Sequence, residues 1–375
     1  MKKIIFISLL LLLISCKRKE ENLLIGDWYF DKIVDYDSTI IKKPKLNLET
    51  TYGNYYNFNI LNDSVLNLKG GFYHSINYNS SYYLGTRTNY KIKGSSIVYF
   101  DKSENDWDTI KIKKIKRDTL VVIGYDEASY QLIKKQNTYF STENYDAIVI
   151  YRSPCYGSCP FNSTYIDRKG NFYFKGYDYN TQNGKFSSKL DKEATVKLFN
   201  YFDKINISKL EDKYFYGATC SQTNVVSFIK NGKIVKTIES YIACPIDLKV
   251  AITKLSYGYQ QVKLNHDYDD NFIFYKAVTF NSFNSKNIKY RLLDSESFFL
   301  EKEIFNGKKV NSNFSEKFEL RFYEIAKDEQ KSDIKKIVSD GRFFKFIKKD
   351  KTFFVIDIGY NFIERNPIIK TNREY

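Results

Sequence analysis

The chain has 375 residues, with 59 Lys and Arg against 44 Asp and Glu, which leaves a formal net charge of +15. A chain of this length is longer than a domain with a single hydrophobic core usually is, so we expect two or three domains rather than one. The 33 Tyr and 30 Phe favour strands, and the presence of only two His excludes most catalytic and metal sites built on that residue.

The first sixteen residues have the pattern of an export signal. Two lysines precede an apolar run, residues 4–14, which is too short to span a bilayer and ends in Leu13-Ile14-Ser15-Cys16. This predicts a cleaved signal peptide over residues 1–15. The last four residues resemble the lipobox of bacterial lipoproteins, which implies a diacylglyceryl thioether on Cys16 and an acylated amino group. Two or three acyl chains make release from a membrane slow.

Residues 16–22 form a charged tether. Its sequence after Cys16 is Lys17-Arg18-Lys19-Glu20-Glu21, and the lack of Asp directly after the cysteine favours delivery to the outer membrane. The basic-then-acidic run also resembles the surface-export tag of some Gram-negative lipoproteins, with a solvated tether as the alternative. We therefore predict a lipid-anchored outer-membrane protein that faces the periplasm or the cell surface.

The mature chain stays basic, because 57 basic residues face 44 acidic ones once the two lysines of the signal are removed. An exported protein with an excess of about +13 is expected to meet anionic lipid headgroups, lipopolysaccharide phosphates or acidic glycans rather than nucleic acid. The lysines are dispersed along the sequence, so solubility alone is the simpler explanation of the charge.

Residues 23–135 predict an antiparallel β domain, because short strand-like runs alternate with tight turns such as Gly94-Ser95. The opening Gly26-Asp27-Trp28 and the closing Tyr130-Gln131-Leu132-Ile133 resemble the ends of lipocalin-like domains. That resemblance implies an up-and-down barrel closed by Trp28 as a structural residue; a sandwich is the alternative. The expected strands cover residues 25–34, 55–61, 64–68, 89–93, 96–100, 108–115, 119–124 and 129–134.

A polar linker, residues 136–145, leads into a predicted α+β domain over residues 146–264. One hairpin turns at Asp167–Gly170, and a second joins Val225–Ile229 to Ile234–Ile238 across Asn231-Gly232, where both turn residues need positive φ. Two apolar stripes at helical spacing predict helices, one behind a capping Asp191 and one started by Pro245. The stripes consist of Leu190, Ala194, Leu198 and Phe202, and of Leu248, Ile252, Leu255 and Tyr259.

The most specific local signature is Ser153-Pro154-Cys155-Tyr156-Gly157-Ser158-Cys159-Pro160. It resembles the Cys-[Phe/Tyr]-Gly-x-Cys-Pro element of an uncharacterised domain of exported bacterial proteins, and the likeness extends over roughly residues 146–262. Gly157 and Pro160 are structural positions of that element. The chain departs from the family pattern at Thr219, which is followed by Cys220 where the family commonly has Asp. The resemblance implies a fold and an exported location, but no reaction.

Cys155, Cys159, Cys220 and Cys244 are the mature thiols besides Cys16, an even number for an oxidising compartment. We predict the bridges Cys155–Cys159 and Cys220–Cys244. The second bridge would close the longer loop and stabilise the folded chain by about 3 kcal/mol in the chain-entropy estimate. Thiol redox chemistry at Cys155 and Cys159 is the alternative, although their spacing is one residue longer than in Cys-x-x-Cys oxidoreductases. A four-cysteine zinc site would usually need closer pairs.

A polar break from His266 to Asn271 precedes a predicted β-rich C-terminal domain with one helix, residues 271–363. Strands are expected at residues 272–279, 288–293, 297–305 and 318–323. A helix is expected at Ile334–Val338, stopped by Asp340-Gly341, and then a closing hairpin of residues 342–347 and 352–358. Residues 360–375 look like a frayed tail.

No residue pattern marks a reaction centre, so we predict no catalytic residues, no metal and no cofactor. His74 and His266 lie in no recognised motif, and the acidic run Asp267–Asn271 lacks the Gly turn and distal Glu of an EF-hand loop. We predict a non-enzymatic binding or structural role. One alternative is a carrier of a small apolar ligand inside the barrel, which a filling by Tyr55, Phe58 and Tyr90 would exclude; the other is a thiol redox protein.

Overall fold

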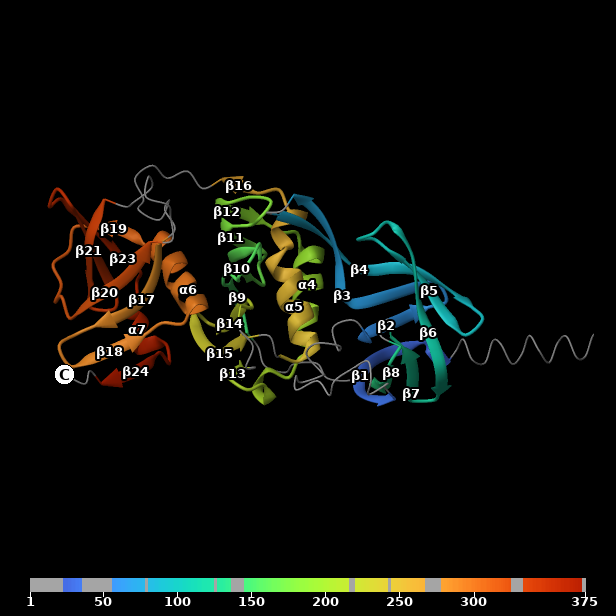
Figure 1. Cartoon of the computed structure of the whole chain (residues 1–375). Helices are drawn as coiled ribbons and strands as arrows, with labels where there is room; N and C mark the ends of the chain where they lie inside the picture. Colours follow the sequence, from blue (N-terminus) through green and yellow to red (C-terminus); the bar gives the residue numbers. More distant parts are fainter. Residues whose placement is uncertain are drawn as a thin grey trace, which may run out of the picture. The chain divides into compact units, whose positions relative to one another are not determined.

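The computed structural model describes residues 23–35, 56–77, 80–124, 127–135, 145–215, 220–241, 244–266, 278–324 and 333–372 (Figure 1). The predicted fold class is confirmed: an N-terminal closed barrel is followed by two further sheets and by helices. The chain forms two compact units. The first contains the barrel strands and Cys244–Val250, and the second contains the central and C-terminal sheets.

Eight antiparallel strands close the barrel in sequential order, with the last strand paired to the first. Trp28 is fully buried, and its Nε1 donates to the carbonyl oxygen of Leu24 at 2.7 Å, so its one polar atom is satisfied inside the core. The strands are β1 (Gly26–Asp35), β2 (Phe58–Asn62), β3 (Val65–Asn77), β4 (Ser80–Lys93), β5 (Ser96–Asp101), β6 (Asp106–Lys116), β7 (Thr119–Ile123) and β8 (Ser129–Lys135).

The central sheet has eight strands in the order β13-β15-β14-β9-β10-β11-β12-β16. Both predicted hairpins are confirmed as β10 with β11 and β14 with β15, and Asn231 and Gly232 have φ of 51° and 70°. The strands are β9 (Ala147–Arg152), β10 (Phe161–Asp167), β11 (Asn171–Asp178), β12 (Gly184–Lys189), β13 (Lys213–Phe215), β14 (Thr223–Lys230), β15 (Lys233–Tyr241) and β16 (Asn265–His266).

Both predicted helices of the central region are confirmed as α4 (Lys192–Asp203) and α5 (Ile246–Ser256). Asp191 caps α4 as expected, because its Oδ1 accepts from the backbone N–H of Ala194 at 2.7 Å. Short 3-10 turns follow each helix, at Ile207–Lys209 and Gly258–Gln261. Figure 1 shows α4 and α5 on one side of the central strands and α6 (Asp294–Phe305) on the other.

Helix α6 corrects the strand expected at residues 297–305. Its residues are buried on all sides, from Ser295 through Glu301, and Ile304 as well. One core cluster joins α6 to the central sheet through Val149 and to the C-terminal sheet through Phe283. Because the helix lies between two sheets, it lacks the polar stripe that reveals a helical period in a sequence.

The C-terminal sheet has the order β19-β23-β22-β21-β20-β17-β18-β24. The helix expected at Ile334–Val338 is wrong, since this segment pairs with β22 as a strand. The tail expected to fray is also wrong, because α7 (Phe362–Arg365) and β24 (Ile369–Asn372) follow and β24 pairs with β18. The other strands are β17 (Val278–Asn284), β18 (Ile288–Arg291), β19 (Lys308–Val310), β20 (Phe318–Glu324), β21 (Ile334–Ser339), β22 (Phe343–Lys348) and β23 (Phe353–Asp357).

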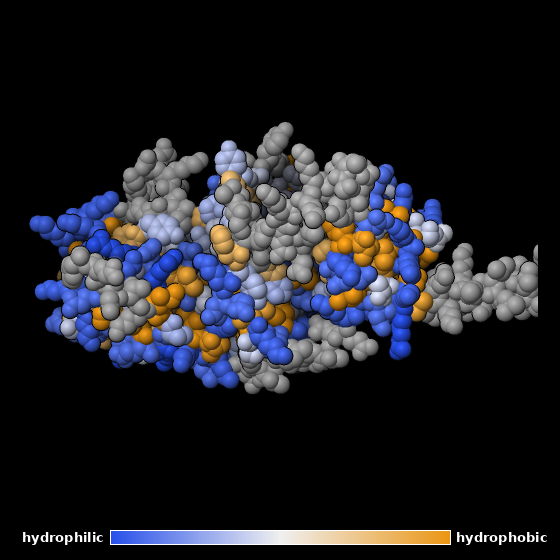
Figure 2. Space-filling view, turned by 60° about the horizontal axis from the view of Figure 1, so that its bottom comes forward, coloured by the Kyte–Doolittle hydropathy of each residue, from blue (hydrophilic) through white to orange (hydrophobic). Residues whose placement is uncertain are grey.

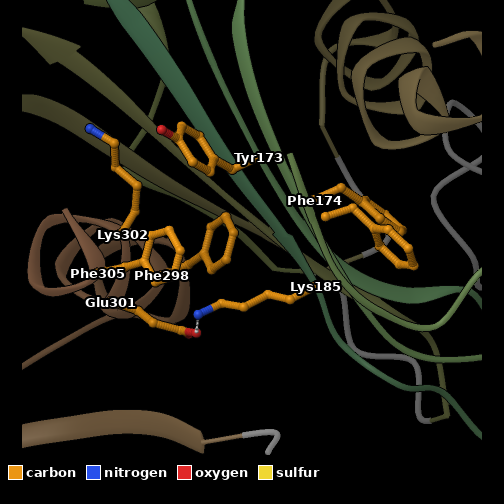
Figure 3. Close-up of a pocket in the computed structure, with 8 residues that line it drawn as sticks. Tyr173, Phe174, Lys185, Phe298, Glu301, Lys302 and Phe305 are labelled. Carbon is orange, nitrogen blue, oxygen red and sulfur yellow. Dashed lines mark ion pairs between the residues drawn. The ribbon is translucent and has the colours of Figure 1, made fainter. Parts of the chain in front are cut away.

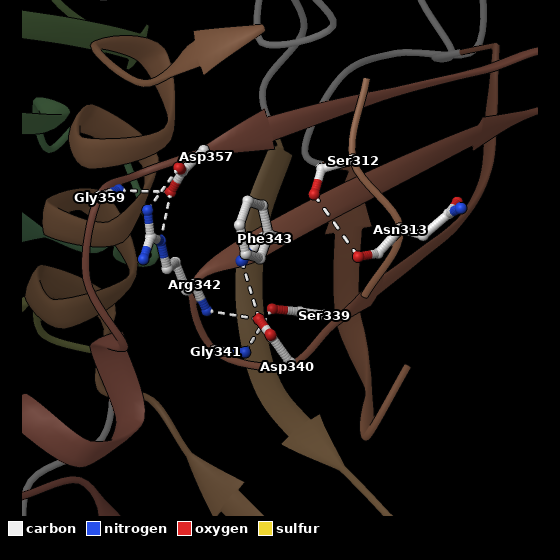
Figure 4. A network of polar contacts seen from close by, with 9 residues as sticks. All are labelled: Ser312, Asn313, Ser339, Asp340, Gly341, Arg342, Phe343, Asp357 and Gly359. Carbon is white, nitrogen blue, oxygen red and sulfur yellow. Dashed lines mark hydrogen bonds and ion pairs between the residues drawn. The ribbon is translucent and has the colours of Figure 1, made fainter. Parts of the chain in front are cut away.

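Asp340 and Gly341, expected to stop a helix, instead form the turn between β21 and β22 (Figure 4). The Oδ1 atom of Asp340 accepts from the backbone N–H groups of Arg342 and Phe343 at 2.8 and 2.9 Å. Arg342 in turn donates twice to the Asp357 carboxylate, both at 2.8 Å. An Asp-Gly pair fits both the end of a helix and a tight turn, so the sequence pattern alone does not distinguish the two.

We expect Leu300→Ala to lower the free energy of unfolding by about 2–5 kcal/mol, because this α6 side chain is fully buried and its truncation leaves a cavity. Urea denaturation followed by circular dichroism measures the change. Val196→Ala is the control: Val196 lies on α4 with 49% of its surface exposed and should change the free energy by less than about 0.5 kcal/mol. Equal losses in both variants would contradict the burial of α6.

Candidate binding site at the end of the central sheet

Several strands of the central sheet reach the same end, where the cysteine motif connects β9 to β10. Arg152, the last residue of β9, lies opposite Asn162 of β10 and Asn224 of β14. The first residue of β14 in turn lies opposite Tyr241, the last residue of β15. Residues 153–160 therefore form a loop at a sheet end that neighbouring strands also line.

The predicted Cys155–Cys159 bridge is present, with 5.7 Å between the two Cα atoms. Cys220 and Cys244 are not bridged to each other in the structure, so this pairing stays a prediction. Cys220 has a left-handed backbone, with φ of 74°, in the turn before β14. The carbonyl oxygen of Cys220 accepts from the N–H of Tyr156 at 3.3 Å, so the backbone of Cys220 contacts the loop that the Cys155–Cys159 bridge closes.

Gln222 fastens both ends of this loop through one side-chain amide. Its Nε2 donates to the carbonyl oxygens of Ser153 and Pro160, at 2.6 and 2.8 Å. Its Oε1 accepts from the Nε and Nη2 atoms of Arg152, at 2.9 and 2.6 Å. The amide thus uses its donors on the loop and its acceptor on the sheet, which restrains the loop relative to β9.

Further contacts support the same arrangement. The backbone N–H of Ser153 donates to the carbonyl oxygen of Thr223, and the N–H of Thr223 donates to the Ser153 hydroxyl, both at 2.9 Å. The guanidinium carbon of Arg152 lies 5.2 Å from the ring centre of buried Tyr257. These contacts come from three separate segments, so the base of the loop is rigid.

The tip of the loop, in contrast, is open. Gly157 has φ of 141°, a conformation that L side chains rarely adopt, and Tyr156 beside it is 89% exposed. Phe215 at the end of β13 is 65% exposed and stacks on Tyr241, with 5.5 Å between the ring centres. The sheet end therefore carries exposed aromatic rings on a braced backbone, a combination typical of binding surfaces.

A pocket beside α6 is the second candidate site (Figure 3). It lies between strands β11 and β12 and helix α6, and its empty space of about 280 Å³ includes open solvent. Glu301 points into it and accepts from Lys175 at 2.8 Å, while Lys185 lies 3.2 Å away. Burial lowers the pKa of Lys175 to about 8, against the opposing effect of the Glu301 carboxylate. Because these charges already pair with one another, we interpret the cluster as structural.

The barrel interior bears on the carrier alternative. Phe58 and Tyr90 both belong to the buried barrel core, while Tyr55 lies outside the described residues. Tyr56 stacks on Tyr130 inside the same cluster, with ring centres 4.5 Å apart. These aromatic side chains occupy part of the barrel interior, which is where a carrier would have to hold an apolar ligand.

The remaining sequence candidates contribute no site. His74 is exposed, and His266 packs edge-on against Phe186 at 4.7 Å between ring centres. The acidic run after His266 and the lipidation residue Cys16 lie outside the described residues. Within the described part of the chain, no cluster of three His, Cys, Asp or Glu residues could hold a metal ion. No helix among these residues is long and apolar enough to cross a membrane.

Comparison with known proteins gives a family for the segment that carries the loop. A family model described as a domain of unknown function (DUF6438) matches residues 146–257, less than a third of the chain. The match overlaps the region whose resemblance to an uncharacterised domain was drawn from the sequence, and it includes the disulfide loop and Gln222. No curated protein and no solved structure matches the chain significantly. The family description assigns no activity.

Sequence reasoning missed Gln222 and Phe215. A glutamine gives no sequence signal of its own, because its two donors and one acceptor find partners only after β9 and β14 pair. Phe215 stands in the short segment Lys213–Phe215, which is too brief to be recognised as a strand. The one sequence signal for Gln222 is its position two residues after Cys220, which places a polar side chain near a cysteine.

We expect Gln222→Glu to speed hydrogen exchange at the amides of Tyr156 and Gly157 at least tenfold. The carboxylate keeps the acceptor for Arg152 but cannot donate to the two loop carbonyls, so the loop opens more often. Exchange measured by mass spectrometry reports the change. Gln261→Glu, at an exposed position, serves as the matched control. Unchanged exchange in Gln222→Glu would contradict the bracing role.

Proposed function

We propose that this chain is a lipid-anchored protein of the cell envelope that binds another envelope protein through the Cys155–Cys159 loop, without catalysing a reaction. The observation that carries the binding role is the contrast within the loop. Tyr156 is 89% exposed, yet the backbone on either side is fixed by the disulfide and by Gln222.

An exposed tyrosine on a fixed backbone suits recognition of a protein surface. Its ring offers a large apolar contact area and its hydroxyl a hydrogen bond, while only two side-chain torsions lose freedom on binding. The bridge and the amide remove most of the loop's own ordering penalty before any partner arrives. Phe215 and Tyr241 extend the aromatic area at the same sheet end.

The anchor is supported by sequence alone. Cys16 ends a lipobox-like segment, and the first described strand begins ten residues later, at Gly26. A covalent lipid would keep the molecule at a membrane surface, where its partners would be other envelope components. This part of the proposal requires that a Cys16→Ala variant is no longer labelled with lipid and is no longer recovered in the membrane fraction.

We expect a photoreactive benzoylphenylalanine at position 156 to form a discrete cross-link to another protein in intact cells. The same probe at Phe353, an exposed residue of the C-terminal sheet at 58%, is the matched control and should not give that product. Mass spectrometry identifies the product, and its yield should fall when Gln222→Glu is added. Identical products from both positions, or none from position 156, would contradict the proposal.

A glycan ligand and redox chemistry would give different results. If the ligand is a glycan, the probe at position 156 would form no protein adduct, and added glycan would protect this position from surface labelling. Redox cycling would make Cys155 and Cys159 reactive toward alkylating agents in cells, whereas a stable bridge leaves them unmodified.

A further inference from the structure

The outer surface of the barrel gathers lysines that are scattered in the sequence. On β4, Lys91 and Lys93 are exposed and alternate with buried residues such as Tyr90. On β6, Lys111, Lys114 and Lys116 are exposed, as is Lys113, which pairs with Asp35. We call this surface the basic barrel face, made of Lys91, Lys93, Lys111, Lys114 and Lys116.

Strand register places these lysines together. Strand β5 lies between β4 and β6, and its residue Ser96 lies opposite both Lys93 and Lys111. Beyond a bulge in β6, Lys114 and Lys116 continue on the same side, opposite Val121 and Thr119. Residues directly opposite one another in antiparallel strands point to the same side of the sheet, so the five ammonium groups share one surface.

An exposed aromatic ring lies at the edge of this face. Trp107 is 45% exposed and packs edge-on against Phe100, with 5.8 Å between the ring centres. The ammonium group of Lys91 lies 3.9 Å from the centre of the Trp107 ring. Figure 2 shows apolar and hydrophilic side chains adjoining on the barrel surface. Tryptophan beside lysine is the combination that sits at membrane interfaces.

Most of this positive charge is not neutralised within the described residues. Among the residues that the structure describes, the ion pair on β6 belongs to Lys113, which meets Asp35 at 3.0 Å, and no carboxylate lies within 4.0 Å of the five lysines of the face. Acidic neighbours such as Asp106 and Asp118 stand at the two ends of β6, where its turns begin. The centre of the face therefore has an uncompensated positive field.

We propose that the basic barrel face binds the anionic lipid headgroups of a membrane. The proposal rests on the proposed anchor, because ten residues from Cys16 to Gly26 can hold β1 no farther than about 35 Å from the lipid. Within that distance the face meets a dense layer of phosphates, and each lysine near such a surface adds to binding. The lipid and the face then act as two signals that together hold the barrel on the bilayer.

The test uses the chain from Lys17 onward, which has neither the signal nor the acylated cysteine. It is mixed with vesicles of phosphatidylcholine alone or with 30% phosphatidylglycerol. We expect binding to the anionic vesicles only, with a blue shift of Trp107 fluorescence, since the other tryptophan, Trp28, is buried. Binding should weaken at least tenfold between 50 and 500 mM salt, because exposed charges are screened.

Lys93→Glu, Lys111→Glu and Lys114→Glu combined should lower the partition coefficient at least tenfold and leave the Lys91–Trp107 contact in place. The matched control reverses three exposed lysines outside the barrel, Lys204, Lys209 and Lys317, and should stay within about twofold of the wild type. Thermal unfolding of both variants checks their folding.

Absence of binding to anionic vesicles, or equal losses in the two triple variants, would overturn the proposal. The anchor is tested separately by the mass of the native protein, so each proposal can fail alone. If the native protein has no acyl modification but the chain still binds anionic vesicles, the anchor is refuted. If the protein is acylated but the chain does not bind these vesicles, binding by the basic barrel face is refuted.

Discussion

The burial of both faces of the central sheet is the constraint on which the second compact unit depends. Every residue from Ala147 to Tyr151 is buried, because α4 and α5 cover one face and α6 covers the other. Helix α6 is held by polar contacts as well as apolar ones. Its Ser295 meets Ser227 of the central sheet at 2.7 Å, and its Ser297 accepts from the N–H of Phe280 in the C-terminal sheet at 2.8 Å. These bonds fix one orientation of the helix, since a buried unpaired hydroxyl would be unfavourable.

The Cys155–Cys159 loop is rigid because of this arrangement. Arg152 ends the strand that α6 covers, and Gln222 joins Arg152 to the loop carbonyls, so the position of the loop follows from the packing of β9. The charged cluster on the opposite part of the sheet has a similar effect. Lys175 on β11 and Glu301 on α6 would each be costly to bury alone, and pairing them specifies how the helix and the sheet meet.

Sequence patterns predicted the barrel, the two central hairpins and helices α4 and α5, because each has a clear period or a specific turn such as Asn231-Gly232. They failed at α6 and β21. Helix α6 is buried on all sides and so lacks a polar stripe, and the apolar spacing of Ile334, Ile337 and Val338 fits a helix as well as a bulged strand. For the site, the Cys155–Cys159 bridge was predictable from its spacing. The Gln222 brace and the basic barrel face were not, because both depend on strand pairing between distant residues.

The most direct test of the central constraint is a chain that ends at residue 266 and therefore lacks α6. Without this helix, the face of β9 and β10 that carries Val149 and Tyr165 is uncovered. The account predicts that amide protection in these two strands falls to that of a partly unfolded state and that the chain binds a hydrophobic dye. Protection equal to that of the full chain, with no dye binding, would contradict it.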